Sequence, residues 1–256
     1  MNLFVFDIET VPDFEAGRKL LGLENLSDAE VGEAMLNQRR QETGNEFLQH
    51  YLHKIVAISV VLKTRDKLMV WSLGEEDSTE KELIERFFDG LSKFKPILIT
   101  WNGTGFDLPV LHYRGLINKV SAPLYWEVGE EDNAFKWNNY INRYHYRHTD
   151  VMDILSSYQA RAAAPLDKIA TLLGFPGKMG MSGDKVWQYY QAGEIKAIRD
   201  YCETDVLNTY LVYLRFELFR GKLTVEQYEN EYLAVKEMLQ HLDKPHLNEF
   251  LESMNA

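Results

Sequence analysis

A short segment near the N-terminus, Leu3–Thr10, constrains the fold more than any other part of the sequence. It reads LFVFDIET, and its continuous apolar half is typical of a strand buried on both faces at the centre of a sheet that helices cover. Because side chains alternate along a strand, Asp7 and Glu9 project from the same face. Two adjacent carboxylates are unfavourable unless they are hydrated at a strand end or hold a cation between them. The spacing alone leaves both interpretations open.

The composition is that of a soluble globular protein. With 256 residues and 45% hydrophobic content, the chain can build one large domain or two small ones. Its single cysteine, Cys202, rules out an internal disulfide and a cysteine-rich zinc site, which indicates a reducing compartment. We see no secretory signal and no apolar run of transmembrane length, so we expect a cytoplasmic protein that does not enter the membrane.

The formal charge of −11 argues against a protein that coats duplex nucleic acid by bulk electrostatics. It does not exclude a nuclease, because cations bound to a cluster of carboxylates would neutralise part of that charge.

Hydrophobic periodicity predicts a mixture of strands and helices. Segment 12–50 is polar and irregular and then helical from about Ser27, where Ser27-Asp28-Ala29-Glu30 resembles a capping box, so we interpret it as an insertion between strands. Segment 121–148 has no clear period, and from Thr149 the pattern is helical almost to the end, interrupted by a glycine-rich turn and Pro245. Further strands are predicted at 54–62, 68–73 and 97–100, and helices at 80–94, from Asp107, and at 197–216.

Two more acidic positions follow later elements. Asp107 comes after the strand 97–100 and a loop with two glycines, where it is interpreted either as a helix N-cap or as a ligand. Tyr201 and Asp205 are four residues apart and share one helix face, whereas Glu203 and Asp200 point elsewhere. Each of these positions alone has an ordinary structural interpretation.

Together, D-x-E on the first strand, N-x-x-x-F-D after a later strand and Y-x-x-x-D on a late helix resemble the DEDDy branch of the DnaQ-like 3′–5′ exonucleases. Within that branch the chain looks like the stand-alone family related to the proofreading exonuclease domain of family B DNA polymerases, and segments 175–186 and 192–215 share the likeness. The resemblance implies an α/β, ribonuclease H-like fold with a mixed central sheet flanked by helices. It implies one exonuclease domain over 1–256, with a helical insertion at 12–50 and a C-terminal helical extension at 223–256.

The resemblance also assigns roles. It makes Tyr201 the fifth catalytic residue beside four metal-binding carboxylates, which are Asp7, Glu9, Asp107 and Asp205. In this family Asp7 is similar to the ligand that bridges two ions. Hard carboxylate oxygens suit Mg²⁺ or Mn²⁺, and a pair of ions can stabilise both the attacking and the leaving oxygen of a phosphodiester. A phenol is neutral at pH 7, so Tyr201 is expected to orient the attacking water.

Several residues are candidates for binding the substrate. Thr10, Asn102 and Phe106 match positions that line the path of the terminal nucleotide in such exonucleases, although turn formation and core packing explain them equally well. Lys178 and Lys185 flank the glycine-rich turn, where they either touch phosphate or are simply solvated. Three histidines, interpreted as structural, are His50, His53 and His112.

Segment 135–148 interleaves aromatic and basic residues more densely than any other stretch. We expect it to grip a single strand through Arg143 and Arg147, with base stacking on its aromatic rings; packing under a long loop as a satellite core is an equal alternative.

These observations predict a two-metal 3′–5′ exonuclease that releases mononucleotides from the free 3′ end of single-stranded DNA. One alternative is an exoribonuclease with the same site, because the motifs do not locate contacts to a 2′-hydroxyl. Another is an inactive nucleic-acid-binding module, which would be expected to lack a carboxylate, and all four are present. The sequence does not identify a polymerase or other protein partner.

Overall fold

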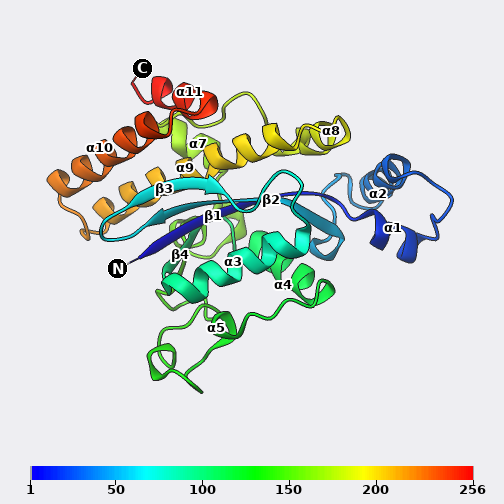
Figure 1. Cartoon of the computed structure of the whole chain (residues 1–256), viewed down its shortest axis with the longest axis horizontal. Helices are drawn as coiled ribbons and strands as arrows, with labels where there is room; N and C mark the ends of the chain where they lie inside the picture. The colour runs from blue at the N-terminus through cyan, green and yellow to red at the C-terminus, as the bar shows by residue number, and fades with distance from the viewer. Residues whose placement is uncertain (1, 256) are drawn as a thin grey trace.

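One mixed sheet organises the chain, for which the computed structural model describes residues 2–255. Its strands are β1 (Leu3–Pro12), β2 (His53–Lys63), β3 (Leu68–Ser72), β4 (Ile97–Thr100) and β5 (His148–Asp150). They lie in the order β3-β2-β1-β4-β5, so the N-terminal strand is central, as predicted (Figure 1). β1 pairs antiparallel with β2, and β2 pairs antiparallel with β3. On the other side, β1 pairs parallel with β4, and β4 pairs parallel with β5.

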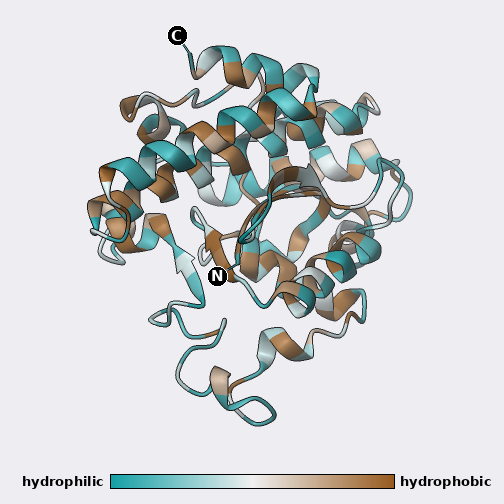
Figure 2. Cartoon of the chain, turned by 60° about the vertical axis from the view of Figure 1, so that its left-hand side comes forward, coloured by the Kyte–Doolittle hydropathy of each residue, from teal (hydrophilic) through white to brown (hydrophobic). Residues whose placement is uncertain are grey.

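Helices cover both faces of the sheet (Figure 1). Phe4 and Phe6 of β1 pack on one face, whereas Val5 packs on the other, as the alternation of a strand requires. The first face is covered by α3 (Glu80–Phe94), α4 (Asp107–Ile117) and α5 (Pro123–Trp126). The second is covered by α7 (Leu166–Leu172), α9 (Ile195–Phe219), α10 (Val225–Leu242) and α11 (Pro245–Ser253). Figure 2 shows helices that alternate between hydrophobic and hydrophilic residues around the apolar strands.

The segment between β1 and β2 contains α1 (Phe14–Leu21) and α2 (Asp28–Thr43). The predicted capping box is present: the Ser27 N–H donates to Glu30 Oε2 at 2.9 Å, and the Glu30 N–H donates to Ser27 Oγ at 3.4 Å. A third apolar cluster joins these helices to the end of β1 and to α8 (Val186–Gln191).

Several predicted elements are confirmed almost to the residue. The predicted helix 80–94 has the same bounds as α3, the strand 97–100 has those of β4, and the helix predicted at 197–216 lies within α9. Short 3₁₀ turns are η1 (His50–Leu52), η2 (Asn133–Phe135), η3 (Ala160–Ala162) and η4 (Gly183–Lys185). Within residues 2–255, no helix is long and apolar enough to cross a membrane.

One prediction for the C-terminal half was wrong. The helical pattern assigned from Thr149 begins instead with β5, and α6 (Val151–Leu155) follows it directly. β5 has no apolar alternation because His148 and Asp150 are buried through hydrogen bonds: the His148 ring bonds Thr100 Oγ1 at 2.9 Å. The predicted interruption at Pro245 is confirmed: α10 ends at Leu242, and Pro245 occupies the first turn of α11, where a missing N–H costs nothing.

Candidate active site

β1 presents the first two carboxylates of the site on the α9 face of the sheet. Asp7 and Glu9 lie opposite Ser59 and Ala57 of β2, and Glu9 is buried. Immediately after Glu9 the register shifts, because Thr10 pairs with Ile55. Such irregularities increase the local twist of a strand pair and re-aim the side chains beside them. The predicted side-by-side placement of the two acids is therefore present on the central strand.

The loop after β4 delivers Asp107 to the same place. Asp107 is the first residue of α4, and its Oδ1 accepts the Ile8 N–H of β1 at 3.2 Å, so its carboxylate does not cap its own helix. The loop is tight: a Cβ on Gly105 would lie 2.4 Å from Asn102 Oδ1. Asp150 of β5 holds it by accepting the N–H groups of Asn102 at 3.0 Å and Thr104 at 2.8 Å.

Asp150 was missed by the sequence analysis. The position of Asp150 at the end of a short buried strand could have indicated its role. Residues 148–150, however, have no strand pattern in the sequence.

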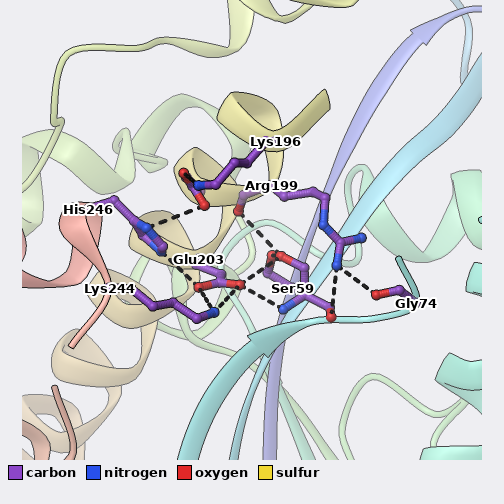
Figure 3. Close-up of polar contacts among 9 residues, drawn as sticks. Ser59, Gly74, Lys196, Arg199, Glu203, Lys244 and His246 are labelled. Atoms are coloured by element: carbon purple, nitrogen blue, oxygen red, sulfur yellow. Dashed lines mark hydrogen bonds and ion pairs between the residues drawn. The ribbon is translucent and has the colours of Figure 1, made fainter. Parts of the chain in front are cut away.

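α9 carries Tyr201 and Asp205 one turn apart, and contacts on its other side fix the helix. Glu203 points away from this pair, as predicted. Its carboxylate accepts the Ser72 N–H of β3 at 2.9 Å, Lys244 Nζ at 3.0 Å and His246 Nε2 at 2.8 Å (Figure 3). These contacts attach α9 both to the sheet and to the start of α11, so Tyr201 and Asp205 are presented by a rigid element.

The carboxylates influence one another strongly. Burial raises the pKa of Asp7 well above its ordinary value, and the charges of Asp107, Glu9 and Asp205 raise it further. Burial and the same two neighbours, Asp205 and Asp107, raise the pKa of Glu9. Burial brings the pKa of Asp107 to about 7 and that of Asp205 to about 6. Acids from three parts of the chain therefore repel one another across this site.

Tyr201 lies at the edge of this cluster. Its pKa is raised by burial and by the charges of Asp205 and Glu9, so its hydroxyl stays protonated at neutral pH. Tyr201 and Asp205 line the same cavity, and the hydroxyl of Tyr201 lowers the pKa of Asp205.

Cys202 also belongs to the site, although the sequence analysis used it only to exclude disulfides. Its Sγ lies 3.4 Å from the Asp7 backbone oxygen and 3.7 Å from Asp7 Oδ2. Burial and the charge of Asp7 raise the pKa of the thiol, so it acts as a weak donor to Asp7 and not as a thiolate ligand. Its spacing of three residues from Asp205 was the signal that placed it on this helix face.

Lys178 provides a positive charge beside Asp205. The two residues line a cavity of about 140 Å³, and Lys178 lowers the pKa of Asp205. The preceding residue, Gly177, is fixed by Asn208, whose Oδ1 accepts the Gly177 N–H at 3.1 Å and whose Nδ2 donates to the Gly177 oxygen at 2.8 Å. Of the two lysines considered from the sequence, Lys178 therefore lies at the site.

The residues expected along the nucleotide path lie around the Asp107 loop. Thr10 follows Glu9, and its Oγ1 bonds His53 Nδ1 at 2.8 Å. Asn102 takes a left-handed conformation with φ of 66° at the start of the loop, and Phe106 ends it. Thr10 and Phe106 thus adjoin Glu9 and Asp107 in the sequence, whereas Asn102 lies at the other end of the loop, beside Asp150.

Arg143 and Arg147 have different environments. Arg143 is partly exposed and pairs with Asp153 at 2.9 Å beside a groove of about 470 Å³ that Asn102 also lines. Arg147 instead stacks on buried Phe135, with its guanidinium carbon 3.9 Å from the ring centroid, and its Nε donates to the Asn138 oxygen at 2.6 Å. Phe135 and Tyr140 of this segment are buried in the apolar cluster on the α3 face of the sheet, and Arg147 supports them structurally.

Comparison with known proteins agrees with this arrangement. A family model described as a predicted 3′–5′ exonuclease related to the exonuclease domain of PolB matches residues 45–254. This range contains Asp107, Tyr201 and Asp205, whereas Asp7 and Glu9 precede it.

Two curated archaeal proteins show local similarity. DNA polymerase 1 of Sulfurisphaera ohwakuensis is 32% identical over 73 residues, which are 28% of this chain and 8% of the polymerase. DNA polymerase 1 of Saccharolobus solfataricus is 50% identical over 42 residues, which are 16% of this chain and 5% of the polymerase. The matched segments thus span only a small part of these polymerases. The family match covers most of the chain, and we conclude that the chain belongs to the family of predicted 3′–5′ exonucleases related to the exonuclease domain of PolB.

Proposed function

We propose that the protein hydrolyses phosphodiester bonds from the 3′ end of single-stranded DNA and releases mononucleotides, with two divalent metal ions in its site. The observation that carries this proposal is that the Asp107 loop and α9 both meet β1 beside Asp7 and Glu9: Asp107 accepts the Ile8 N–H, and Cys202 of α9 contacts Asp7. Tyr201 and Asp205 of the same helix line one cavity. Buried acids that raise one another's pKa values need bound cations to be ionised together at neutral pH.

The donor set fits Mg²⁺ or Mn²⁺. All four ligand side chains offer hard carboxylate oxygens, and the neighbouring Cys202 thiol is protonated. By similarity to the family, Asp7 would contact both ions, Glu9 and Asp205 would complete one site, and Asp107 would serve the other. When bound, such ions activate a water molecule and stabilise charge on the attacking and leaving oxygens.

The remaining groups orient the reactants. The Tyr201 hydroxyl, which stays protonated and lines the same cavity as Asp205, would orient the attacking water by hydrogen bonding. Lys178 supplies a positive charge for a phosphate oxygen in the adjacent cavity. The groove beside Asn102 and Arg143 is suited to the upstream part of the strand, where Arg143 can exchange Asp153 for phosphate.

The polarity of digestion tests this proposal directly. We expect a linear single strand labelled at its 5′ end to shorten one nucleotide at a time in Mg²⁺ or Mn²⁺ and to survive in chelator. A circular single strand of the same sequence should persist, and a matched RNA strand should be degraded more slowly. Cleavage of the circle would indicate an endonuclease, preference for RNA an exoribonuclease, and inertness toward every substrate a binding module.

The variant Tyr201→Phe is expected to lower turnover by about 100-fold, a contribution typical of one positioned hydrogen-bonding group. Metal binding should be little changed, because the phenol is not among the ligands. Single-turnover rates measured beside calorimetric titration with Mn²⁺ separate the two effects, and Tyr113→Phe, at an exposed position of α4, is the matched control. An unchanged rate would remove Tyr201 from the mechanism.

A further inference from the structure

Four aromatic rings cluster where the end of the 12–50 insertion meets the Asp107 loop. The Phe47 ring centroid lies 5.4 Å from those of His53 and Phe106, and the His50 centroid lies 6.0 Å from that of Phe106. Phe47 is nevertheless 54% exposed, so much of its ring has no protein partner. His50 and His53, which were interpreted from the sequence as isolated structural histidines, belong to this cluster.

This aromatic cluster is connected directly to the carboxylate site. His53 Nδ1 bonds the hydroxyl of Thr10 at 2.8 Å, and Thr10 follows Glu9 on β1. His50 Nε2 bonds the Gly105 oxygen at 2.8 Å, and Phe106 immediately precedes Asp107. The aromatic cluster therefore contacts two separate segments of the chain. One adjoins Glu9 and the other adjoins Asp107.

Hydrogen bonds hold Phe47 in place despite its exposure. Its N–H donates to Asn45 Oδ1 at 3.0 Å, and its backbone oxygen accepts from Arg39 Nε of α2 at 2.8 Å. Burial lowers the pKa of His53 to about 4, so the ring beneath Phe47 is a neutral imidazole at pH 7. Phe47, Phe106 and the neutral His53 ring thus form a fixed aromatic surface beside the acidic site.

We propose that Phe47, supported by Phe106, forms a stacking platform for a nucleobase at the 3′ end of the substrate strand. This inference rests on the proposed function and adds a substrate-binding residue to it, supplied by the insertion. Every nucleobase has an apolar face that can cover an exposed ring. Such stacking is independent of sequence, as stepwise digestion from an end requires.

The test compares three substitutions at position 47. Phe47→Ala should raise KM about tenfold, the lower-to-middle range for loss of one base–aromatic stack, with kcat little changed. Phe47→Leu should show a similar increase, because it keeps apolar volume without a π-face, and Phe47→Trp should restore the wild-type KM. A substrate whose 3′-terminal nucleotides are abasic should have the same KM with wild type and Phe47→Ala.

A binding measurement makes the result independent of turnover. In a hydrolysis-deficient Asp205→Asn background, a strand with 2-aminopurine at its 3′ end should lose fluorescence on binding, and Phe47→Ala should abolish this quenching. Phe219→Ala, which truncates a phenylalanine that is 82% exposed on α9, is the matched control and should change neither readout. Unchanged KM and quenching in Phe47→Ala, with an unaltered melting temperature, would overturn the platform. Absence of hydrolysis by the wild-type protein would instead count against the proposed function.

Discussion

Asp7→Asn is expected to reduce hydrolysis by at least about 10³-fold while making the metal-free protein more stable. Under the proposed function, activity would be lost because Asp7 would no longer provide the charge that holds the ions, and the ions would supply much of the stabilisation of the transition state. The gain in stability follows because burial and three neighbouring acids oppose the ionised form of Asp7. Loss of activity together with a gain in stability is the combination expected when a buried metal ligand is removed, and few other substitutions in this chain would produce both effects.

Thermal unfolding with and without Mn²⁺ measures the two effects together. At 100 times its dissociation constant, the ion should stabilise the wild-type protein by ~2.7 kcal/mol, a rise in melting temperature of roughly 5–10 °C for a chain of this size. Asp7→Asn should start from a higher melting temperature and lose most of this rise. Asp89→Asn, on the exposed face of α3, is the control and should match the wild type. A variant that hydrolyses DNA at the wild-type rate would refute the assignment of Asp7.

The same cluster sets the expected pH dependence of the metal-free protein. Because burial raises the pKa of Asp107 to about 7, the folded protein binds this proton more tightly than the unfolded chain. The stabilisation that protonated Asp107 gives the folded state is therefore complete at low pH and is lost as the pH rises from about 4 through about 7. This is opposite to the usual behaviour of a carboxylate. Bound metal ions should flatten this dependence.

The sequence predicted the parts of the fold whose pattern is local. The apolar run before Asp7, the cap and amphipathic face of α3 and the spacing of Tyr201 and Asp205 all depend on neighbouring residues, and these elements form where expected. β5 was missed because three residues with polar side chains carry no period, and only their hydrogen bonds to β4 and the Asp107 loop bury them.

The candidate site, like the fold, was predictable from the sequence only in part. Its acids were recognised because three motifs occur in a fixed order, but which neighbours meet them depends on long-range contacts. The alternation of basic and aromatic residues did not distinguish Arg143, beside an open groove, from Arg147, stacked on buried Phe135. Likewise, nothing near Phe47 in the sequence indicated that it would lie against Phe106, fifty-nine residues later.

The scaffold behind the site makes a prediction of its own at Arg114. This buried arginine of α4 donates from Nη2 and Nε to the two oxygens of Glu80, at 2.6 and 2.8 Å, and from Nη1 to Asp13. Asp13 caps α1, and Glu80 Oε1 also accepts the Ile55 N–H of β2 at 2.7 Å. One guanidinium thus joins the start of the insertion, α3 and the sheet to the helix that begins at Asp107.

Arg114→Met is therefore expected to lower the free energy of unfolding by ~3–5 kcal/mol, because it leaves two buried carboxylates without a cation. The melting temperature should fall by roughly 10 °C for a chain of this size. Arg86→Met is the matched control: it removes a pair with Glu82 on the exposed face of α3, at 2.8 Å, and should change stability by less than about 0.5 kcal/mol.

A second set of substitutions distinguishes charge burial from lost packing. If unpaired charge causes the loss, adding Asp13→Asn and Glu80→Gln to Arg114→Met should recover much of the stability, since neighbouring sites in one network are not additive. Equal stability of the single and triple variants would show that the arginine acts through its volume alone. Recovery would instead establish that the insertion is held to the catalytic domain by an ion network, in which each acid is tolerated in the core only because Arg114 neutralises it.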